Sequence, residues 1–274
     1  MEQFIDVPGG RLFAVSDGAG PPIVLIHAAI ADLRSWDAMV PGLVAAGYRV
    51  IRYDYRGFGR STTEDVEFSN RADLVSLLDA LGIRRAALVG NSRGGGIAFD
   101  AAIDFPDRVV AVVGVGAGLN GFDGTATLDE LALFQHAGTV MSAAEPDLDL
   151  VADLAVELWV DGPGQPRDRV DPGIRATVRA MCRPLSEPGR VHGRLTTMDP
   201  PANDRLADLK CPVLAVAGRL DLSTIVQAAR RVEVGAPNAR AVIWPDVAHM
   251  IGMEVPDRLS ALVVEFLDPL RPWE

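Results

Sequence analysis

A serine between two glycines is the feature of this chain with the clearest chemistry. Residues 90–94 read Gly-Asn-Ser-Arg-Gly, so Ser92 stands in a G-x-S-x-G pattern. The apolar run before it predicts a short buried strand, and the residues from Gly94 onwards predict a helix. Such a strand-to-helix turn exposes the serine hydroxyl above the sheet, where it can act as a nucleophile. Glycine on both sides lets the strand end and the helix start pass closely, where a Cβ would clash.

A serine hydroxyl is a poor nucleophile at neutral pH, so a base must take its proton and later return it to the leaving group. We expect His249 to be that base and Asp221 to orient its imidazole and stabilise the imidazolium. Asp221 follows a predicted strand at 211–217, and His249 follows another at 240–244. Sites in open parallel sheets form beyond the carboxyl ends of the strands, so these side chains should converge on the serine. Asp123, after an earlier strand, stays open as the alternative acid.

The anionic oxygen of a tetrahedral intermediate needs hydrogen-bond donors, and two backbone amides are candidates. Arg93 follows the nucleophile directly, and Ala29 follows a predicted strand at 22–27. Two interpretations of the Arg93 side chain remain open, packing against a helix carboxylate, which we favour, and attraction of an acidic substrate. Further candidate pocket residues are His27, Ala28, Trp36, Asn91, Trp159 and Met250.

Two of these candidates carry a second interpretation. His27 is expected to bond the oxyanion loop rather than to carry a proton. Trp159 is expected either to line the pocket or to anchor the surrounding segment on the sheet, and the sequence favours neither.

Alternating strand and helix patterns must position these residues. Residues 3–8 and 10–16 predict a hairpin, and later apolar runs, separated mostly by helical patterns, predict strands at 22–27, 48–53, 86–89, 109–115, 211–217 and 240–244. This alternation predicts an α/β fold with a parallel sheet, right-handed crossovers and helices on both faces.

The pattern changes between residues 118 and 205. Pro, Asp and Gly interrupt helical segments there, and no strong strand is predicted. We interpret 118–205 as a helical cap over the sheet edge, and 1–117 with 206–274 as the core domain. Four large apolar residues of the cap could form an acyl site, although packing within the cap is the favoured interpretation: Phe134, Met141, Met181 and Met198.

Composition restricts the partners. The chain has 274 residues and a net charge of −11, which argues against nucleic acid and against an anionic membrane surface. No apolar run is long enough to span a membrane, and no signal-peptide pattern occurs, so we expect a cytoplasmic location. Neither His136 nor His192 has metal-ligand spacing, and we expect no metal and no cofactor. The expected partner is a small molecule, and a homodimer stays open.

The chain resembles α/β-hydrolase fold enzymes over nearly its whole length. The resemblance rests on the motif around Ser92, on His27-Ala28-Ala29, on Gly218-x-x-Asp221, on Ala248-His249, and on residues 52–61, which are similar to a D-x-R-G-x-G-x-S loop. It implies a mostly parallel eight-stranded sheet flanked by helices, with a helical cap. Residues 32–37 resemble the 3-oxoadipate enol-lactonase group, and residues 90–95 resemble hydrolases that cleave carbon–carbon bonds in vinylogous diketones.

This resemblance implies a serine hydrolase that cleaves a small ester or lactone through an acyl-enzyme. Alternatives are a carbon–carbon bond hydrolase, a cofactor-free perhydrolase or haloperoxidase-like side activity, and a ligand-responsive binding protein. Serine at the nucleophile argues against haloalkane dehalogenase and epoxide hydrolase chemistry, which in this fold use aspartate there. Two departures stand out. Ala28 replaces the usual glycine, and Met250 follows His249 where carbon–carbon hydrolases typically carry tryptophan.

Overall fold

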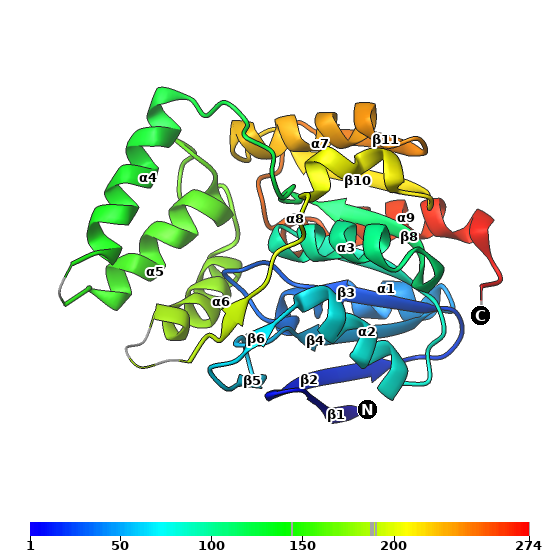
Figure 1. Cartoon of the computed structure of the whole chain (residues 1–274). Helices are drawn as coiled ribbons and strands as arrows, with labels where there is room; N and C mark the ends of the chain where they lie inside the picture. The colour runs from blue at the N-terminus through cyan, green and yellow to red at the C-terminus, as the bar shows by residue number, and fades with distance from the viewer. Residues whose placement is uncertain (144, 187–188, 190, 274) are drawn as a thin grey trace.

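A central sheet extends across the protein (Figure 1). The computed structural model describes residues 1–143, 145–186, 189 and 191–273. The main strands are β1 (Glu2–Val7), β2 (Gly10–Asp17), β3 (Pro22–Ile26), β4 (Arg49–Asp54), β7 (Ala86–Asn91), β8 (Val109–Val115), β10 (Val213–Gly218) and β11 (Ala239–Trp244). They lie in the order β1-β2-β4-β3-β7-β8-β10-β11, and the short β5 (Thr62–Thr63) pairs with β2 beside this path.

The sheet is parallel from β4 to β11. Only β1 with β2, β2 with β4 and β2 with β5 pair antiparallel among the described strands. The predicted α/β-hydrolase fold, with a mostly parallel sheet of eight strands, is confirmed. Because its strands are parallel, β3, β7, β8, β10 and β11 all end at the same edge of the sheet.

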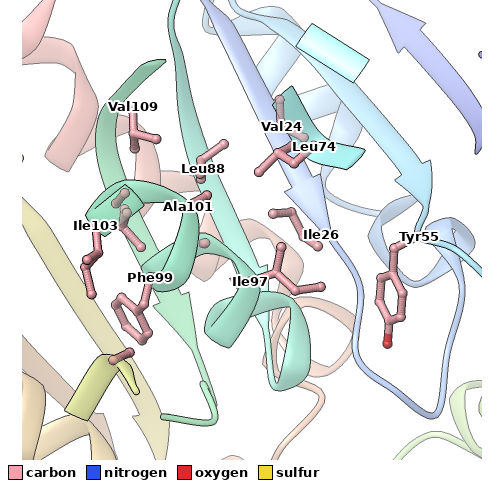
Figure 2. Packing of buried hydrophobic residues seen from close by; sticks show 14 of the residues in the cluster. Val24, Ile26, Tyr55, Leu74, Leu88, Ile97, Phe99, Ala101, Ile103 and Val109 are labelled. Atoms are coloured by element: carbon pink, nitrogen blue, oxygen red, sulfur yellow. The ribbon is translucent and has the colours of Figure 1, made fainter. Parts of the chain in front are cut away.

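Helices cover both faces of the sheet because its strands carry apolar side chains on both sides. In β3, Val24 and Ile26 join one buried cluster, while Ile23 and Leu25 join the other. Figure 2 shows the first cluster from close by. It includes side chains of α2 (Asn70–Ala80), α3 (Arg93–Asp104) and α7 (Ser223–Gly235). The second cluster includes side chains of α1 (Val40–Ala45), α8 (Ile251–Glu254) and α9 (Pro256–Leu267).

Helix boundaries follow local capping. Ser69 caps α2 as its pattern suggests, since its hydroxyl accepts the amide of Ala72. The sequence pattern of residues 33–46 predicts a single helix that ends at Gly47, and this prediction is wrong, because the segment divides into the 3-10 helix η1 (Leu33–Trp36) and α1. Pro41 has no amide to donate back along a continuous helix, so it is tolerated only in the first turn of α1.

Most of the predicted cap is helical. Between β8 and β10 lie α4 (Leu128–Met141), α5 (Leu148–Val156), the π-helix η3 (Glu157–Asp161), α6 (Pro172–Cys182), η4 (Arg183–Ser186) and η5 (Ala202–Asp208). Figure 1 shows α4, α5 and α6 together at one side of the sheet. The two-residue β9 (Arg194–Leu195), too short for a sequence pattern, pairs with β6 (Glu67–Phe68). The boundaries 118 and 205 stay a prediction, and residues 144, 187, 188 and 190 within them lie outside the described residues.

Two further 3-10 turns complete the described elements, η2 (Pro106–Arg108) before β8 and η6 (Asp268–Leu270) after α9. Within the described ranges, no helix has the length and apolar character needed to cross a bilayer.

Candidate active site

Ser92 lies on the turn between β7 and α3, with φ of 55° and ψ of −119°. It is the only non-glycine residue with positive φ in the described part of the chain. Such a backbone costs about 1–3 kcal/mol and persists only where the surroundings enforce it. The Ser92 amide donates to the carbonyl of Val115 on β8 (3.0 Å), and its carbonyl accepts the amides of Gly95 and Gly96. The turn is therefore fixed from both sides, as a nucleophile elbow requires.

The glycines beside Ser92 are required by close backbone contacts. A Cβ on Gly90 would lie 2.2 Å from the carbonyl oxygen of Gly94. A Cβ on Gly94 would lie 2.2 Å from the carbonyl oxygen of Ile26, at the end of β3. The close passage of strand end and helix start that the sequence suggested is present.

His249 and Asp221 form a buried pair. The imidazole Nδ1 lies 2.7 Å from Oδ2 of Asp221, and the two side chains are 1% and 0% exposed. The other carboxylate oxygen accepts the amide of Leu222 at 2.7 Å, so both oxygens are held. Nδ1 therefore carries the proton, and Nε2 is left as the acceptor. Asp123, the alternative acid, is exposed and is not the partner of His249.

Asn91 connects the elbow to the histidine loop. Its side-chain amide donates to the carbonyl of Val115 (2.8 Å) and to the carbonyl of His249 (3.1 Å). No hydrogen bond between the Ser92 and His249 side chains is recorded among the described residues. The Asn91 bonds nevertheless hold the Ser92 turn beside the backbone of His249, and catalytic hydrogen bonds often tighten only when substrate binds.

The two candidate oxyanion donors lie at one cavity. Ala29 and Arg93 both line it. Arg93 is the first residue of α3, and the first amides of a helix have no acceptor within the helix, so its amide is free to bind an anion. Ala28 does not have the positive φ that glycine would favour, so its departure from the usual motif introduces no backbone strain.

His27 anchors the oxyanion loop and does not line the cavity. It is fully buried, its Nδ1 donates to the carbonyl of Ala28 (2.8 Å), and its Nε2 accepts the amide of Tyr55 (3.3 Å). Its ring stacks on Tyr55 with centroids 4.1 Å apart. Burial, with a smaller effect of the Arg93 charge, lowers the pKa of His27 to about 4.

This lowered pKa predicts a pH-dependent loss of stability. Between pH 6.5 and about 4 the unfolded chain binds a proton that the folded His27 does not, so the free energy of unfolding falls as pH falls. From pH 7 to pH 5, His27 should account for a loss of about 2 kcal/mol, and His27→Gln should remove that part of the slope. Urea unfolding at both pH values measures it.

The comparison must be made between the two proteins, because Asp54 and Asp100 act in the opposite direction. Burial raises the pKa of each carboxyl to about 6, so each stabilises the fold as pH falls. If the free energy of unfolding changed equally with pH in wild type and in His27→Gln, the lowered pKa of His27 would be contradicted.

The cavity has a volume of about 620 Å³, in the range of small-molecule sites. Its wall is mostly apolar and combines residues that follow β4, such as Tyr55 and Phe58, with residues of α4 and α5. Trp159 of η3 lines it, and the Trp159 ring centroid lies 4.5 Å from that of His249. This tryptophan therefore joins the cavity wall to the histidine.

Several other residues that were predicted to line the pocket do not line the cavity. With His27, these side chains are buried and absent from the cavity wall: Ala28, Trp36, Asn91 and Met250. Trp36 packs on Gly252 in the core, Ala28 and Met250 join a small apolar cluster with cap residues, and Asn91 is held by carbonyls. Conversely, Phe134 and Met141 line the cavity, although packing within the cap was favoured for them. Met181 and Met198 are buried in clusters.

Most of the lining residues that the sequence did not single out belong to the segment between β8 and β10, and four others come from the segment after β4 and the start of α2: Tyr55, Arg56, Phe58 and Asn70. The position of Tyr55 to Phe58 directly after a parallel strand is the signal that would have found them.

No cluster of three or more His, Cys, Asp or Glu side chains able to hold a metal ion occurs in the described ranges. His192 lines the cavity, and both cysteines are free.

An ion pair ties the segment between β8 and β10 to the histidine loop. Glu254 accepts the amide of Ala248 on one oxygen (3.0 Å) and the Arg169 guanidinium on the other (2.6 Å). Arg169 also donates to the carbonyls of Val160 and Asp161, next to Trp159. The side chains of Arg169 and Glu254 are only 14% and 6% exposed. The pair therefore holds the backbone beside His249 and the end of η3 together.

Glu254→Gln should lower the free energy of unfolding by about 3 kcal/mol, because it leaves a largely buried guanidinium without its counter-ion. Chemical denaturation measures the change. Glu265→Gln is the matched control, since Glu265 is exposed and its pair with Arg240 spans 3.7 Å. The control should lose less than about 1 kcal/mol. Equal losses in both variants would show that the buried pair contributes nothing particular.

The chain is similar to known proteins of the alpha/beta hydrolase fold. Residues 21–153 match the family model described as alpha/beta hydrolase fold. Epoxide hydrolase B of Mycobacterium tuberculosis is 28% identical, with 99% of each chain covered. Rhodomycin D methylesterase DauP of a Streptomyces species is 29% identical, with 91% of each covered. The structure of Est816, described as an N-acyl homoserine lactone degrading enzyme, is 26% identical with a TM-score of 0.75, covering 96% of this chain and 100% of that one.

The fold, the match over residues 21–153 and these relatives together support an α/β-hydrolase. Its fold and its relatives support hydrolytic activity.

Proposed function

We propose that this hydrolase cleaves a small ester or lactone through an acyl-enzyme on Ser92. The observation that carries the proposal is the combination of a strained elbow serine with a buried His249–Asp221 pair. The apolar cavity is lined by Arg93, the neighbour of the serine, and by Trp159, whose ring lies against His249. Nε2 of His249 takes the Ser92 proton as the hydroxyl oxygen attacks the substrate carbonyl. The amides of Arg93 and Ala29 stabilise the resulting oxyanion. His249 then protonates the leaving alkoxide.

Water completes the cycle. It attacks the acyl-serine while His249 accepts its proton, and the second tetrahedral intermediate returns the proton to Ser92 as the acid leaves. Throughout, Asp221 keeps Nδ1 protonated and stabilises the charged imidazolium. The mostly apolar cavity wall favours an acyl or lactone group of small to medium size.

The residue type at the nucleophile position favours one of the chemistries that the relatives suggest. Epoxide hydrolase B is named for a reaction that enzymes of this fold carry out with aspartate at the elbow, whereas this chain has Ser92 there. A serine nucleophile instead gives an ester intermediate, as the methylesterase and the lactone-degrading relatives support. Carbon–carbon bond cleavage has less support, because Met250 stands where those hydrolases typically carry tryptophan.

Covalent labelling and turnover together test the proposal. A fluorophosphonate probe should label Ser92 in intact protein, located by mass spectrometry of the peptides, and p-nitrophenyl esters or small lactones should be hydrolysed. Ser76→Ala, which changes a serine on α2, is the control and should retain both properties. Cleavage of a vinylogous diketone without ester turnover would replace the proposal with a carbon–carbon hydrolase. Tight ligand binding without labelling or turnover would replace it with a binding protein.

A further inference from the structure

The cavity wall is cationic although the protein is strongly acidic. The chain carries a net charge of −11, yet no Asp or Glu lines the cavity in the part of the wall that the structure describes. Two arginines do, Arg56 and Arg93. A negative protein repels anions at long range, so a cationic wall in its main cavity indicates a local preference for a negative ligand.

Arg56 is already neutralised inside the protein. Its guanidinium makes two hydrogen bonds of 2.8 Å to the carboxylate of Asp73. The two side chains are 1% and 5% exposed. A buried bidentate pair of this kind leaves little charge for a ligand. The charge that remains in the wall is that of Arg93.

Arg93 has no counter-ion among the described residues. Packing against a helix carboxylate, the interpretation that the sequence favoured, has no carboxylate partner in the described structure. The recorded neighbours of the guanidinium are two aromatic residues, Tyr55 and Phe58, with its Cζ 6.0 Å from the ring centroid of Phe58. Because Arg93 directly follows Ser92, a group bound to its side chain would belong to the molecule that reacts at the serine.

A second polar group stands beside Arg93. Asn70 and Arg93 both line the main cavity, and both also line a smaller cavity of about 250 Å³, so they lie where the two meet. Asn70 is 8% exposed, and its Oδ1 is buried without a hydrogen-bond partner. Oδ1 is an acceptor and cannot pair with a carboxylate, but a half-turn of the side-chain amide exchanges it for the NH₂ group, which can donate to one.

We propose that Arg93 and Asn70 form a subsite for a carboxylate of the substrate, separate from the carbonyl that reacts at Ser92. The inference rests on the proposed function and deepens it, because it names the substrate as an acidic ester or lactone. The guanidinium supplies paired N–H donors that match a carboxylate, and the Asn70 amide supplies a further donor.

Two esters that differ by one charge test the subsite. They are p-nitrophenyl hexanoate and the mono-p-nitrophenyl ester of adipic acid, which carries a carboxylate at the far end of an acyl chain of equal length. Wild type should prefer the acidic ester. Arg93→Met should lower the ratio of kcat/KM for the acidic over the neutral ester by about 10- to 100-fold. Arg93→Lys should keep part of the preference, because it keeps the charge without the paired donors.

Arg84→Met is the matched control. It removes the same charge from an exposed position outside the cavity wall, and it should leave the ratio unchanged. Asn70→Asp, which is nearly isosteric, should lower the ratio because its carboxylate competes for Arg93. An unchanged ratio in Arg93→Met would overturn the subsite, as would an equal change in Arg84→Met.

A binding measurement separates this inference from the proposed function. Adipate and hexanoate contain no ester, so their binding by calorimetry does not depend on an acyl-enzyme. Adipate should bind wild type more tightly than hexanoate does, and Arg93→Met should remove the difference. Loss of adipate binding in Arg93→Met with no ester turnover in wild type would support the subsite and contradict the proposed function. Ester turnover in wild type without any preference for the acidic ester would support the proposed function and contradict the subsite.

Discussion

Ser92→Ala is expected to lower kcat/KM for the best ester by about four to six orders of magnitude, because it removes the attacking oxygen and no neighbouring group can replace it. The fold should survive. The Ser92 side chain makes no recorded hydrogen bond among the described residues, and alanine meets the same backbone strain as serine at φ of 55°. Steady-state kinetics, thermal unfolding and probe labelling on the same preparation measure the three effects.

Ser92→Gly separates loss of the hydroxyl from damage to the turn. Glycine adopts positive φ without cost, so this variant should be more stable than Ser92→Ala by about 1 kcal/mol and equally inactive. If either variant kept more than about a hundredth of the wild-type rate, after removal of trace contaminants, Ser92 would not be the nucleophile and the acyl-enzyme mechanism would be wrong.

The sequence was most informative where backbone geometry restricts the residue type. Gly90 and Gly94 are needed because a Cβ on either would meet a carbonyl oxygen, and this constraint marked the elbow. Asp221 and His249 could be placed because parallel strands deliver the residues after them to one edge of the sheet. These predictions required only the order of the strands.

The cavity wall was harder to predict because an apolar residue near a strand end can face either the cavity or the core. Trp36 and Met250 were expected in the pocket, and both are 1% exposed in buried clusters. Phe134 and Met141 were expected to pack within the cap, and they line the cavity instead. The face of α4 that points to the sheet depends on how the predicted cap packs on the core, and no local pattern in the sequence indicates this packing.

Asp221→Asn is expected to lower kcat by about 10⁴-fold at neutral pH, although it changes neither the size nor the shape of the side chain. The hydrogen bonds around this side chain determine the orientation of the asparagine amide. The amide of Leu222 donates to Oδ1 at 2.7 Å, so the carbonyl oxygen of asparagine must stay at that position. Its NH₂ group then occupies the position of Oδ2, 2.7 Å from Nδ1 of His249. A donor there requires Nδ1 to be the acceptor, so the proton moves to Nε2.

His249 with its proton on Nε2 cannot accept the proton of Ser92, and the variant should fold normally while it fails in the acylation step. Kinetics and thermal unfolding of Asp221→Asn, with Asp123→Asn as the matched control, measure this. Asp123 is exposed and does not bond to His249, so its variant should retain the wild-type rate. The opposite pattern, with Asp123→Asn inactive and Asp221→Asn active, would assign the acid to the earlier strand. Because both variants remove one carboxylate charge, only the position of the acid relative to the imidazole can account for a difference between them.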